Sequence, residues 1–430
     1  MDRYLYDTYV QILHEELKPA MGCTEPIAVA YAGALARKAL GRQPREVKLA
    51  VSGNIIKNVK SVIVPHTGGR KGLRTAVAAG LLFGQADREL EVLSDAQEEQ
   101  FSRIDAFLEE LSLTVERSDA QNPFDIQVWA DEAYVRIFGT HTNVVELRRG
   151  DQVLLSAPYE DSPLTAPENR KLLTVQQIVE FADTVALEDV QPLLDTQIRL
   201  NTAIAQEGMS GKYGAGIGKI LLRSYGSSVQ NRAKAYAAAG SDARMNGCEM
   251  PVVINSGSGN QGLTASLPVI IYAEETGASR EMLYRALVVS NLTAIHLKTG
   301  IGTLSAYCGA TSAGAGAGAG IAYLYGGKYS EIAHTVVNTL AINSGMICDG
   351  AKSSCAAKIA SAVEAGLLGL QMYMHDSQFY GGDGIVVKGV ENTIRAVGEL
   401  AREGMKETDL EIIHLMMEQE AKAEKKPEKS

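Results

Sequence analysis

The stretch Ile347-Cys348-Asp349-Gly350-Ala351-Lys352-Ser353-Ser354-Cys355 joins two apolar, helix-like runs through a glycine-containing break. It carries two thiols, and a third, Cys308, lies forty residues before Cys348. Iron–sulfur clusters are held by several cysteine thiolates. Three cysteines brought together by packed helices would leave one iron of a cubane cluster without a protein sulfur, and such an iron is a Lewis acid. The alternative is that these cysteines are buried packing residues.

Length and composition narrow the class of protein. The 430 residues are 46% hydrophobic and 21% charged, which is ordinary for a globular protein with more than one domain. The formal charge of −10 argues against nucleic acid as a partner. No apolar signal core and no long apolar run are present, so we expect a cytoplasmic protein that does not bind a membrane. An odd, sparse set of cysteines indicates reduced thiols: Cys23, Cys248, Cys308, Cys348 and Cys355.

The pattern of the first part predicts an α+β domain over 1–170, with a mixed or antiparallel sheet and substrate-binding loops. Its first helices, over 4–18 and 27–40, are candidates to pack on the domain that follows. Ser52-Gly53-Asn54 is expected to be a turn, and a further helix is expected over 72–83. Alternating apolar residues predict strands at 47–51, 61–64, 89–93, 125–130, 133–138, 144–148 and 152–156.

Helical periodicity then continues to the end, which predicts an all-α catalytic domain over 171–424 and a polar tail over 425–430. The glycine–alanine tract over 313–320 would weaken an exposed helix, so we expect a central helix with very close neighbours. Helices are predicted at 175–183, 185–206, 213–224, 228–240, 260–275, 279–298, 305–325, 329–347, 353–374, 386–403 and 407–423.

Several local patterns suggest chemistry. Cys308 and Cys355 each fall in the first turn of a predicted helix, where the helix terminus lowers a thiol pKa. The stretch from Asn255 to Gly262 is rich in Gly, Ser and Asn ahead of a helix, which is typical of an anion-binding nest but also of a plain turn. Thr24 either caps the helix that follows it or helps to hold a carboxylate. His141 lies in a polar turn, where a histidine is more often exposed than catalytic.

Together these motifs resemble the L-cysteine desulfidase family, within the wider group of iron–sulfur L-serine dehydratases. The resemblance runs in order from residue 22 to residue 355. One departure is the basic loop with His66, Arg70 and Lys71, where relatives have small or apolar residues. The matching motifs are Gly22-Cys23-Thr24-Glu25-Pro26, Ser52-Gly53-Asn54 with Lys57-Asn58, His141-Thr142-Asn143, Ser210-Gly211-Lys212, Ser241-Asp242-Ala243-Arg244-Met245, Asn255 to Gly262, the Cys308 segment and Ile347 to Cys355.

The resemblance implies an oxygen-sensitive [4Fe-4S] lyase without pyridoxal phosphate, which converts L-cysteine to pyruvate, ammonia and sulfide. It implies Cys308, Cys348 and Cys355 as cluster ligands, with Cys23 as a fourth ligand or a base of lowered pKa. The candidate catalytic residues are Cys23, His141 and Lys352. The candidate substrate-binding residues are Thr24, Glu25, Asn54, Lys57, Thr142, Asn143, Asn255, Ser256, Ser258, Asn260 and Gln261.

Two other functions remain open from the sequence. L-serine dehydratase would use the same cofactor, with oxygen in place of sulfur in the leaving group. A non-catalytic protein would use the Asn255–Gly262 stretch to hold a small anion, with the cysteines as packing residues. The expected partner is a small amino-acid substrate. A homodimer is the default expectation for the assembly, because two-fold homo-oligomers are the commonest.

Overall fold

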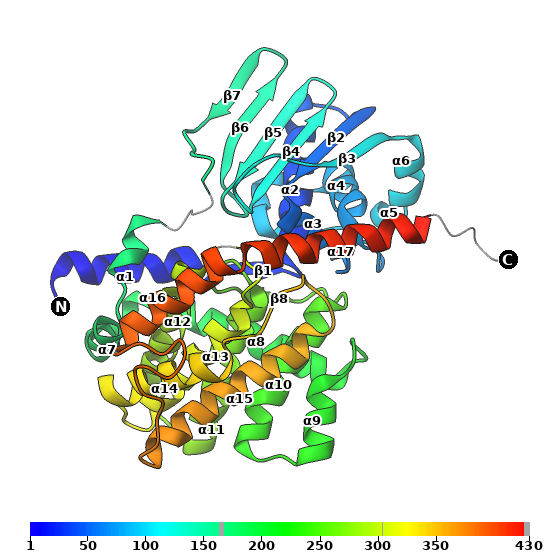
Figure 1. Cartoon of the computed structure of the whole chain (residues 1–430). Helices are drawn as coiled ribbons and strands as arrows, with labels where there is room; N and C mark the ends of the chain where they lie inside the picture. The colour runs from blue at the N-terminus through cyan, green and yellow to red at the C-terminus, as the bar shows by residue number, and fades with distance from the viewer. Residues whose placement is uncertain (163–166, 303, 425–430) are drawn as a thin grey trace.

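The computed structural model describes residues 1–162, 167–302 and 304–424 (Figure 1). A sheet with its helices forms one part of the molecule, and a larger helical region forms the other. The predicted α+β fold class is therefore confirmed. The expected polar tail over 425–430 lies outside the described residues. Within the described ranges, no helix is long and apolar enough to cross a membrane.

The sheet has six strands in the order β3-β2-β4-β5-β6-β7. Strands β2 and β3 are parallel and all other neighbours are antiparallel, so the predicted mixed sheet is confirmed. Helix α2 (Thr24–Leu40) covers β4 and β5, and helix α4 (Gly72–Phe83) packs on α2. The strands are β2 Glu46–Val51, β3 Ser112–Arg117, β4 Asp125–Ala130, β5 Ala133–Phe138, β6 Val144–Arg149 and β7 Gln152–Ser156.

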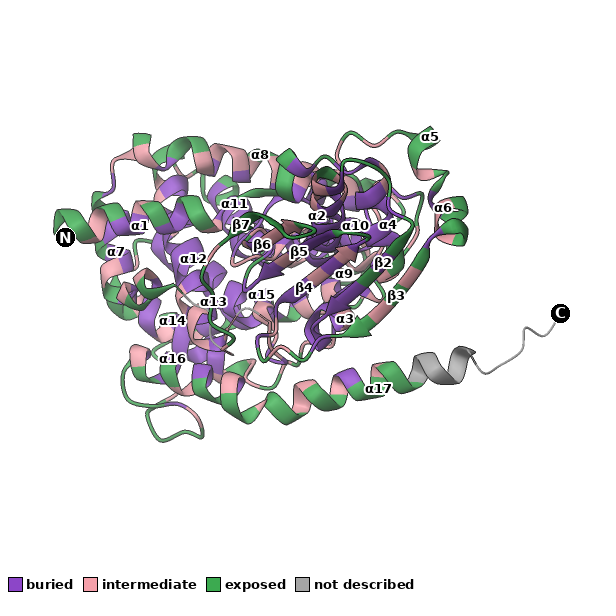
Figure 2. Cartoon of the chain, turned by 90° about the horizontal axis from the view of Figure 1, so that it is seen from above, coloured by how far each residue is buried: buried purple, intermediate pink, exposed green. Residues whose placement is uncertain are grey.

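The helical region is built around α13, whose residues from Ala310 to Tyr323 are all buried (Figure 2). At Gly314 an added Cβ would lie 2.3 Å from the carbonyl oxygen of Ala362 in α15. The glycine–alanine tract therefore forms the predicted central helix with close neighbours. The helices are α7 Val175–Thr184, α8 Gln191–Ser210, α9 Ile217–Tyr225, α10 Val229–Met245, α11 Gly259–Thr276, α12 Arg280–Ile301, α13 Gly309–Leu324, α14 Tyr329–Ile342, α15 Cys355–Met374, α16 Val390–Glu399 and α17 Lys406–Glu424.

The N-terminal segment reaches the helical region, as expected for the first helix. Helix α1 (Arg3–Glu16) contacts α12, and the Tyr9 hydroxyl donates to the carbonyl oxygen of Leu172 at 2.9 Å. Strand β1 (Pro19–Met21) pairs with β8 (Pro251–Val253). The helical region is thus not strictly all-α, because strand β8 lies within it. The sequence analysis did not predict this short strand. The domain boundary near residue 170 remains a prediction and falls in the 3₁₀ helix Glu168–Leu172.

Three local predictions in the first region were wrong, and one strand was not predicted. Residues 61–64 form only an isolated bridge between Ile63 and Lys71, and residues 89–93 overlap the 3₁₀ helix Ala86–Glu91. Ser52 does not begin a turn but caps helix α3 (Gly53–Val59). Strand β3 was missed. Short apolar runs fit a helix or a strand equally well, so periodicity alone does not separate them.

Candidate active site

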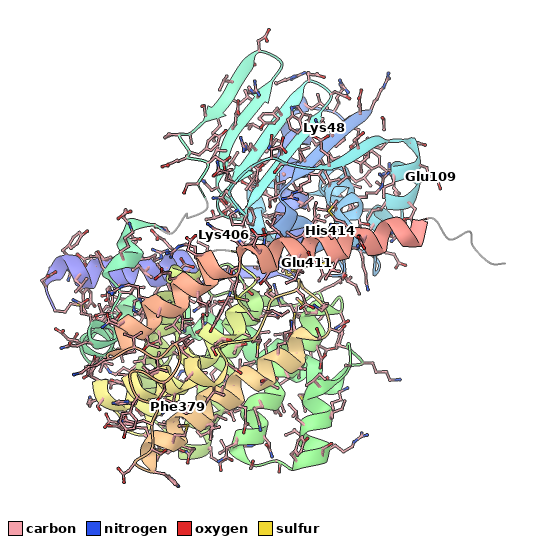
Figure 3. All side chains as sticks on the ribbon, in the orientation of Figure 1. Lys48, Glu109, Phe379, Lys406, Glu411 and His414 are labelled. Carbon is pink, nitrogen blue, oxygen red and sulfur yellow. The ribbon has the colours of Figure 1, made fainter. Side chains whose placement is uncertain are left out.

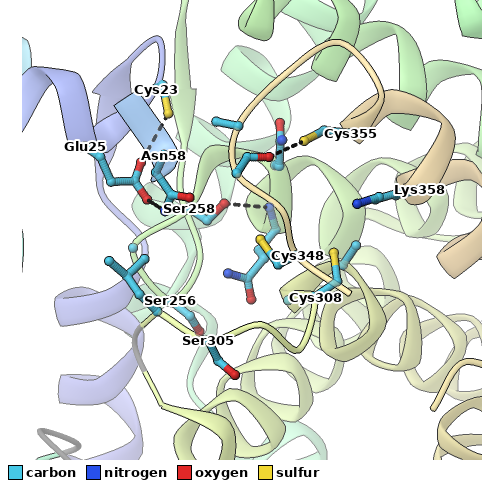
Figure 4. Close-up of a pocket in the computed structure, with 18 of the residues that line it drawn as sticks. Cys23, Glu25, Asn58, Ser256, Ser258, Ser305, Cys308, Cys348, Cys355 and Lys358 are labelled. Atoms are coloured by element: carbon cyan, nitrogen blue, oxygen red, sulfur yellow. Dashed lines mark hydrogen bonds between the residues drawn. The ribbon is translucent and has the colours of Figure 1, made fainter. Parts of the chain in front are cut away.

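One cavity between the N-terminal segments and the helical region gathers four of the five cysteines (Figure 4). Cys23 precedes α2, Cys308 precedes α13, Cys348 lies in the loop before α15, and Cys355 begins α15. Cys248 is buried elsewhere and does not line the cavity. The structure therefore brings together the four cysteines that the sequence analysis singled out.

Backbone pairing explains how two distant cysteine segments meet. Tyr307 and Ile347 form an isolated antiparallel bridge. The amide of Cys308 donates to the carbonyl oxygen of Met346 at 3.0 Å, and the amide of Cys348 donates to that of Ala306 at 2.6 Å. The positions of Cys308 and Cys348 are thus fixed by main-chain hydrogen bonds and do not depend on side-chain packing alone.

The three thiols of the helical region differ in pKa. The hydrogen bond from Cys308, with Lys57 and Lys298 nearby, lowers the pKa of Cys348 to about 5 despite burial. The same hydrogen bond, together with burial, raises the pKa of Cys308, and burial raises the pKa of Cys355. The lowering expected from the helix N-termini is therefore not found at Cys308 and Cys355, because burial and neighbouring thiols outweigh the helix termini.

Cys23 belongs to a buried network on the opposite wall. Its thiol donates to Glu25 Oε2 at 3.1 Å, and Asn58 Nδ2 donates to Glu25 Oε1 at 3.0 Å. Burial, followed by the Glu25 carboxylate, raises the pKa of Cys23 well above its usual range. The sequence analysis expected the opposite shift. Cys23 itself occupies the N-cap of α2, so Thr24 is not the cap. The Thr24 hydroxyl donates instead to the Gly257 carbonyl oxygen at 2.8 Å.

His141 lies in the loop between β5 and β6 and is buried, in contrast to the exposed position that is usual for a loop histidine. Its ring packs edge-on against Phe124, with 4.6 Å between centroids. Its Nε2 atom is buried and has no hydrogen-bond partner among the described residues. Burial lowers the pKa of His141, which Glu25 offsets in part. The lowered pKa keeps the ring neutral near pH 7.

The Asn255–Gly262 stretch forms a tight loop ahead of α11. Asn255 anchors it, because its side-chain amide donates to Asn291 Oδ1 at 3.0 Å and accepts from the Ser256 hydroxyl. Ser256, Ser258, Asn260 and Gln261 line the cavity, whereas Asn255 lies behind the loop and does not. This loop places polar side chains and the N-terminus of α11 at the cavity wall, which suits a carboxylate.

Two buried cations in the cavity were missed by the sequence analysis as site residues. Arg244 donates to Asn260 Oδ1 at 3.1 Å, and its Nε atom lacks a hydrogen-bond partner within the described chain. Burial lowers the pKa of Lys298 to about 8, although Cys348 and Cys308 counteract this effect. Neither cation forms a salt bridge with a described carboxylate. Arg244 stands in a quoted motif, whereas nothing in the sequence pattern singled out Lys298.

Several predicted site residues lie outside this cavity. Asn54 donates its side-chain amide to Asp409 at 2.5 Å, and Asn143 donates to the Phe138 carbonyl oxygen. Lys352 pairs with Asp349 at 2.5 Å. Thr142 lines a second cavity, which shares four residues with the first: His141, Ser256, Gly257 and Lys298.

The departure from the family pattern also lies away from the site. Arg70 pairs with Asp105 at 2.6 Å, and His66 lies 3.5 Å from Glu249. Neither of these residues, nor Lys71, lines the cavity that holds the cysteines. The basic loop therefore contributes no side chain to the wall of that cavity.

The donor set fits an iron–sulfur cluster. Four cysteine side chains face one cavity, and Lys57, Lys298 and Lys358 also line it, so an anionic cluster would be surrounded by positive charge. In the part of the chain that the structure describes, no group of three or more His, Cys, Asp or Glu side chains is arranged to hold a single metal ion. A cluster of several irons is larger than one ion, so its cysteine ligands need not meet at a point.

The sequence of the chain is that of a protein of the serine dehydratase class. Residues 87–414 match the family model described as serine dehydratase alpha chain, and the chain belongs to that family. This membership indicates a lyase-type enzyme that acts on amino acids.

The chain is also similar over nearly its whole length to proteins described as UPF0597 proteins. It is 56% identical to one from Desulfitobacterium hafniense (strain Y51), over 97% of this chain and 98% of the relative. It is 44% identical to one from Treponema denticola, over 97% and 99%, and 46% identical to one from Finegoldia magna, over 95% and 99%.

Proposed function

We propose that the protein is an iron–sulfur lyase that converts L-cysteine and water to pyruvate, ammonia and hydrogen sulfide by α,β-elimination. The observation that carries the proposal is the convergence of Cys23, Cys308, Cys348 and Cys355 on one cavity that also holds buried cations. Family membership supports the lyase class. The substrate and cofactor come from the resemblance of the site motifs and from the chemistry of the donor set.

The chain would bind the substrate carboxylate at the N-terminus of α11. Arg244 has an unpartnered Nε atom and is held by Asn260, and Ser256, Ser258 and Gln261 add polar groups at the same wall. An arginine recognises a carboxylate through two parallel hydrogen bonds.

Cys308, Cys348 and Cys355 would hold the cluster, and Cys23 is the candidate for the fourth position. When bound, the cluster supplies Lewis-acid chemistry toward the leaving sulfur. His141 is the preferred base for the α-proton, because its ring is neutral near pH 7 and its Nε2 atom has no hydrogen-bond partner in the described structure. The protonated thiol of Cys23 makes it a weaker base. Loss of the α-proton and the β-thiolate gives aminoacrylate, which is hydrolysed to pyruvate and ammonia.

L-serine is the second candidate substrate. The description of the matching family favours serine, whereas the cavity position of Cys23 in the Gly-Cys-Thr-Glu-Pro motif favours cysteine. Both substrates offer the same carboxylate and amino group, and they differ only in the leaving atom.

The test is an anaerobic purification with iron and acid-labile sulfide analysis, followed by pyruvate assays on L-cysteine and L-serine. About four irons per chain and faster turnover of cysteine would support the proposal. Faster turnover of serine would move the protein to the dehydratases. A Cys348→Ala variant should lose iron, whereas Cys248→Ala is the matched control and should retain it. A colourless, inactive protein after anaerobic reconstitution would favour a non-catalytic anion-binding protein instead.

A further inference from the structure

The C-terminal helix reaches the candidate site through one carboxylate. Helix α17 runs along the outside of the molecule, where the sheet and the helical region meet (Figures 1, 2 and 3). It packs on α3: the Lys60 ammonium donates to the Met416 carbonyl oxygen at 2.6 Å, and buried Ile413 lies against Gly53. One turn of α17 before Ile413, Asp409 points toward α3.

Asp409 provides the counter-charge of a buried lysine. The Lys57 side chain is only 1% exposed, and its ammonium forms a salt bridge with Asp409 Oδ1. Asn54 Nδ2 donates to the other carboxylate oxygen at 2.5 Å. Among the described residues, Asp409 is the only carboxylate that pairs with Lys57. A buried ammonium that loses its partner leaves an uncompensated charge, which is strongly unfavourable.

Lys57 in turn supports the loop that carries Cys348. Its ammonium donates to the Cys348 carbonyl oxygen at 3.4 Å. The backbone of Gly350 approaches Lys57 so closely that an added Cβ would lie 2.4 Å from the Lys57 carbonyl oxygen. The loop therefore rests on α3, and α3 rests on α17.

The same C-terminal segment also touches the other cysteine segment. The Ser305 hydroxyl donates to the Ala401 carbonyl oxygen at 3.2 Å and accepts from the amide of Tyr307 at 3.0 Å. Ala401 lies in the π-helical turn Leu400–Gly404, directly before α17. The C-terminal segment thus braces both halves of the bridge that brings Cys308 and Cys348 together.

We infer that Asp409 is a positioning residue of this site, which acts through Lys57 to hold the Cys348 loop in place. The mechanical link stands on the contacts above. That it serves an iron–sulfur lyase rests on the proposed function.

The test is hydrogen–deuterium exchange in the metal-free protein. The amide of Cys348 donates to Ala306, so its exchange reports on the loop. Asp409→Asn should speed exchange of peptides over 346–352 about tenfold, the change that corresponds to about 1.4 kcal/mol. Glu411→Gln is the matched control, because Glu411 is exposed on the same helix and its substitution removes the same charge. It should leave exchange unchanged, and Asp409→Glu should restore most of the protection.

A double-mutant cycle separates this role from a general effect on stability. Lys57→Met removes the cation that Asp409 compensates, so Asp409→Asn should add less than a twofold increase in exchange in that background. An Asp409→Asn effect of equal size in both backgrounds would overturn the inference. So would unchanged exchange in a folded Asp409→Asn protein. If the Asp409→Asn single variant fails to fold but the Lys57→Met/Asp409→Asn double variant folds, then the carboxylate acts through Lys57, as inferred.

The cycle needs no metal, so its outcome is independent of the proposed function. If the exchange results hold but the wild-type protein binds no iron, then the proposed function fails and the positioning role stands. If the wild-type protein is an active iron–sulfur lyase and exchange is unchanged in Asp409→Asn, then the positioning role fails alone.

Discussion

Replacement of Gly314 by alanine should destabilise the protein, although alanine is the better helix former. The added methyl carbon would lie 2.3 Å from the Ala362 carbonyl oxygen and 2.6 Å from its carbonyl carbon. Non-bonded carbon atoms attract best at about 3.5–4.0 Å, so α13 and α15 would have to separate by about 1 Å. Overpacking of this kind costs about 1–3 kcal/mol, and the gain in helix propensity offsets about 0.5–1 kcal/mol. The expected net loss is about 1–2 kcal/mol.

The assay is urea unfolding of the metal-free protein followed by circular dichroism. Gly300→Ala is the matched control: it is the same change inside α12, and its Cβ would meet only Gly398 Cα at 3.5 Å, an ordinary contact. The control should be neutral or stabilising by up to about 1 kcal/mol. A Gly314→Ala midpoint equal to or above that of the parent would refute the claim that close approach of α13 and α15 requires glycine.

Three further predictions concern charged groups. Arg244→Lys should raise the KM for the amino-acid substrate at least about tenfold, because a hydrogen bond to a charged group contributes about 1.5–3 kcal/mol. Arg232→Lys, on the same helix, is the control and should leave KM unchanged. A KM of Arg244→Lys equal to that of the parent protein would contradict the carboxylate role. Burial lowers the pKa of His141, so kcat/KM should hold until the pH falls below the usual histidine value of about 6.5, and an acid limb at higher pH would argue against this base. Burial raises the pKa of Glu391, but the hydrogen bond with His296 outweighs burial, so the pKa of Glu391 is lowered in the folded protein. The carboxylate therefore stabilises the fold above its unfolded pKa of about 4.3, and this contribution is lost as the pH falls through the lower folded pKa. Glu391→Gln should therefore cost about 1 kcal/mol at pH 7, after allowance for solvent screening, and almost nothing near pH 3 in urea unfolding; equal losses at both pH values would contradict this sign.

The sequence predicts the fold best where its pattern is long. The helices from α7 onward and strands β4 to β7 show sustained periodicity, and the helix ends were placed within about six residues of their observed positions. The turn assigned at Ser52-Gly53-Asn54 is the start of helix α3, which Ser52 caps and which packs against Ile413 of α17. Contacts with a segment more than 350 residues away leave no local pattern.

The candidate site, too, could be predicted where its sequence pattern is dense and local. The cysteines and the Asn255–Gly262 loop were recognisable because they form dense motifs. The direction of the shift in the Cys23 pKa was not predictable, because burial and Glu25 outweigh the helix terminus only in the folded chain. Arg244 was quoted only as part of a family motif, and Lys298 was one lysine on a long helix. Their role emerges from the lack of a salt-bridge partner in the described structure, which sequence does not record.

The pairing of β1 with β8 also has a consequence for biosynthesis. Met21 pairs with Pro251, about 230 residues later in the chain. At about 5–20 residues per second, a ribosome needs roughly ten to fifty seconds to make the residues between them. Cys23 follows β1 by two residues and so cannot take its place in the cavity during that time. Cys348 and Cys355 are made later still. Any cofactor that these thiols share must therefore be inserted after translation has passed most of the chain, into a nearly finished protein.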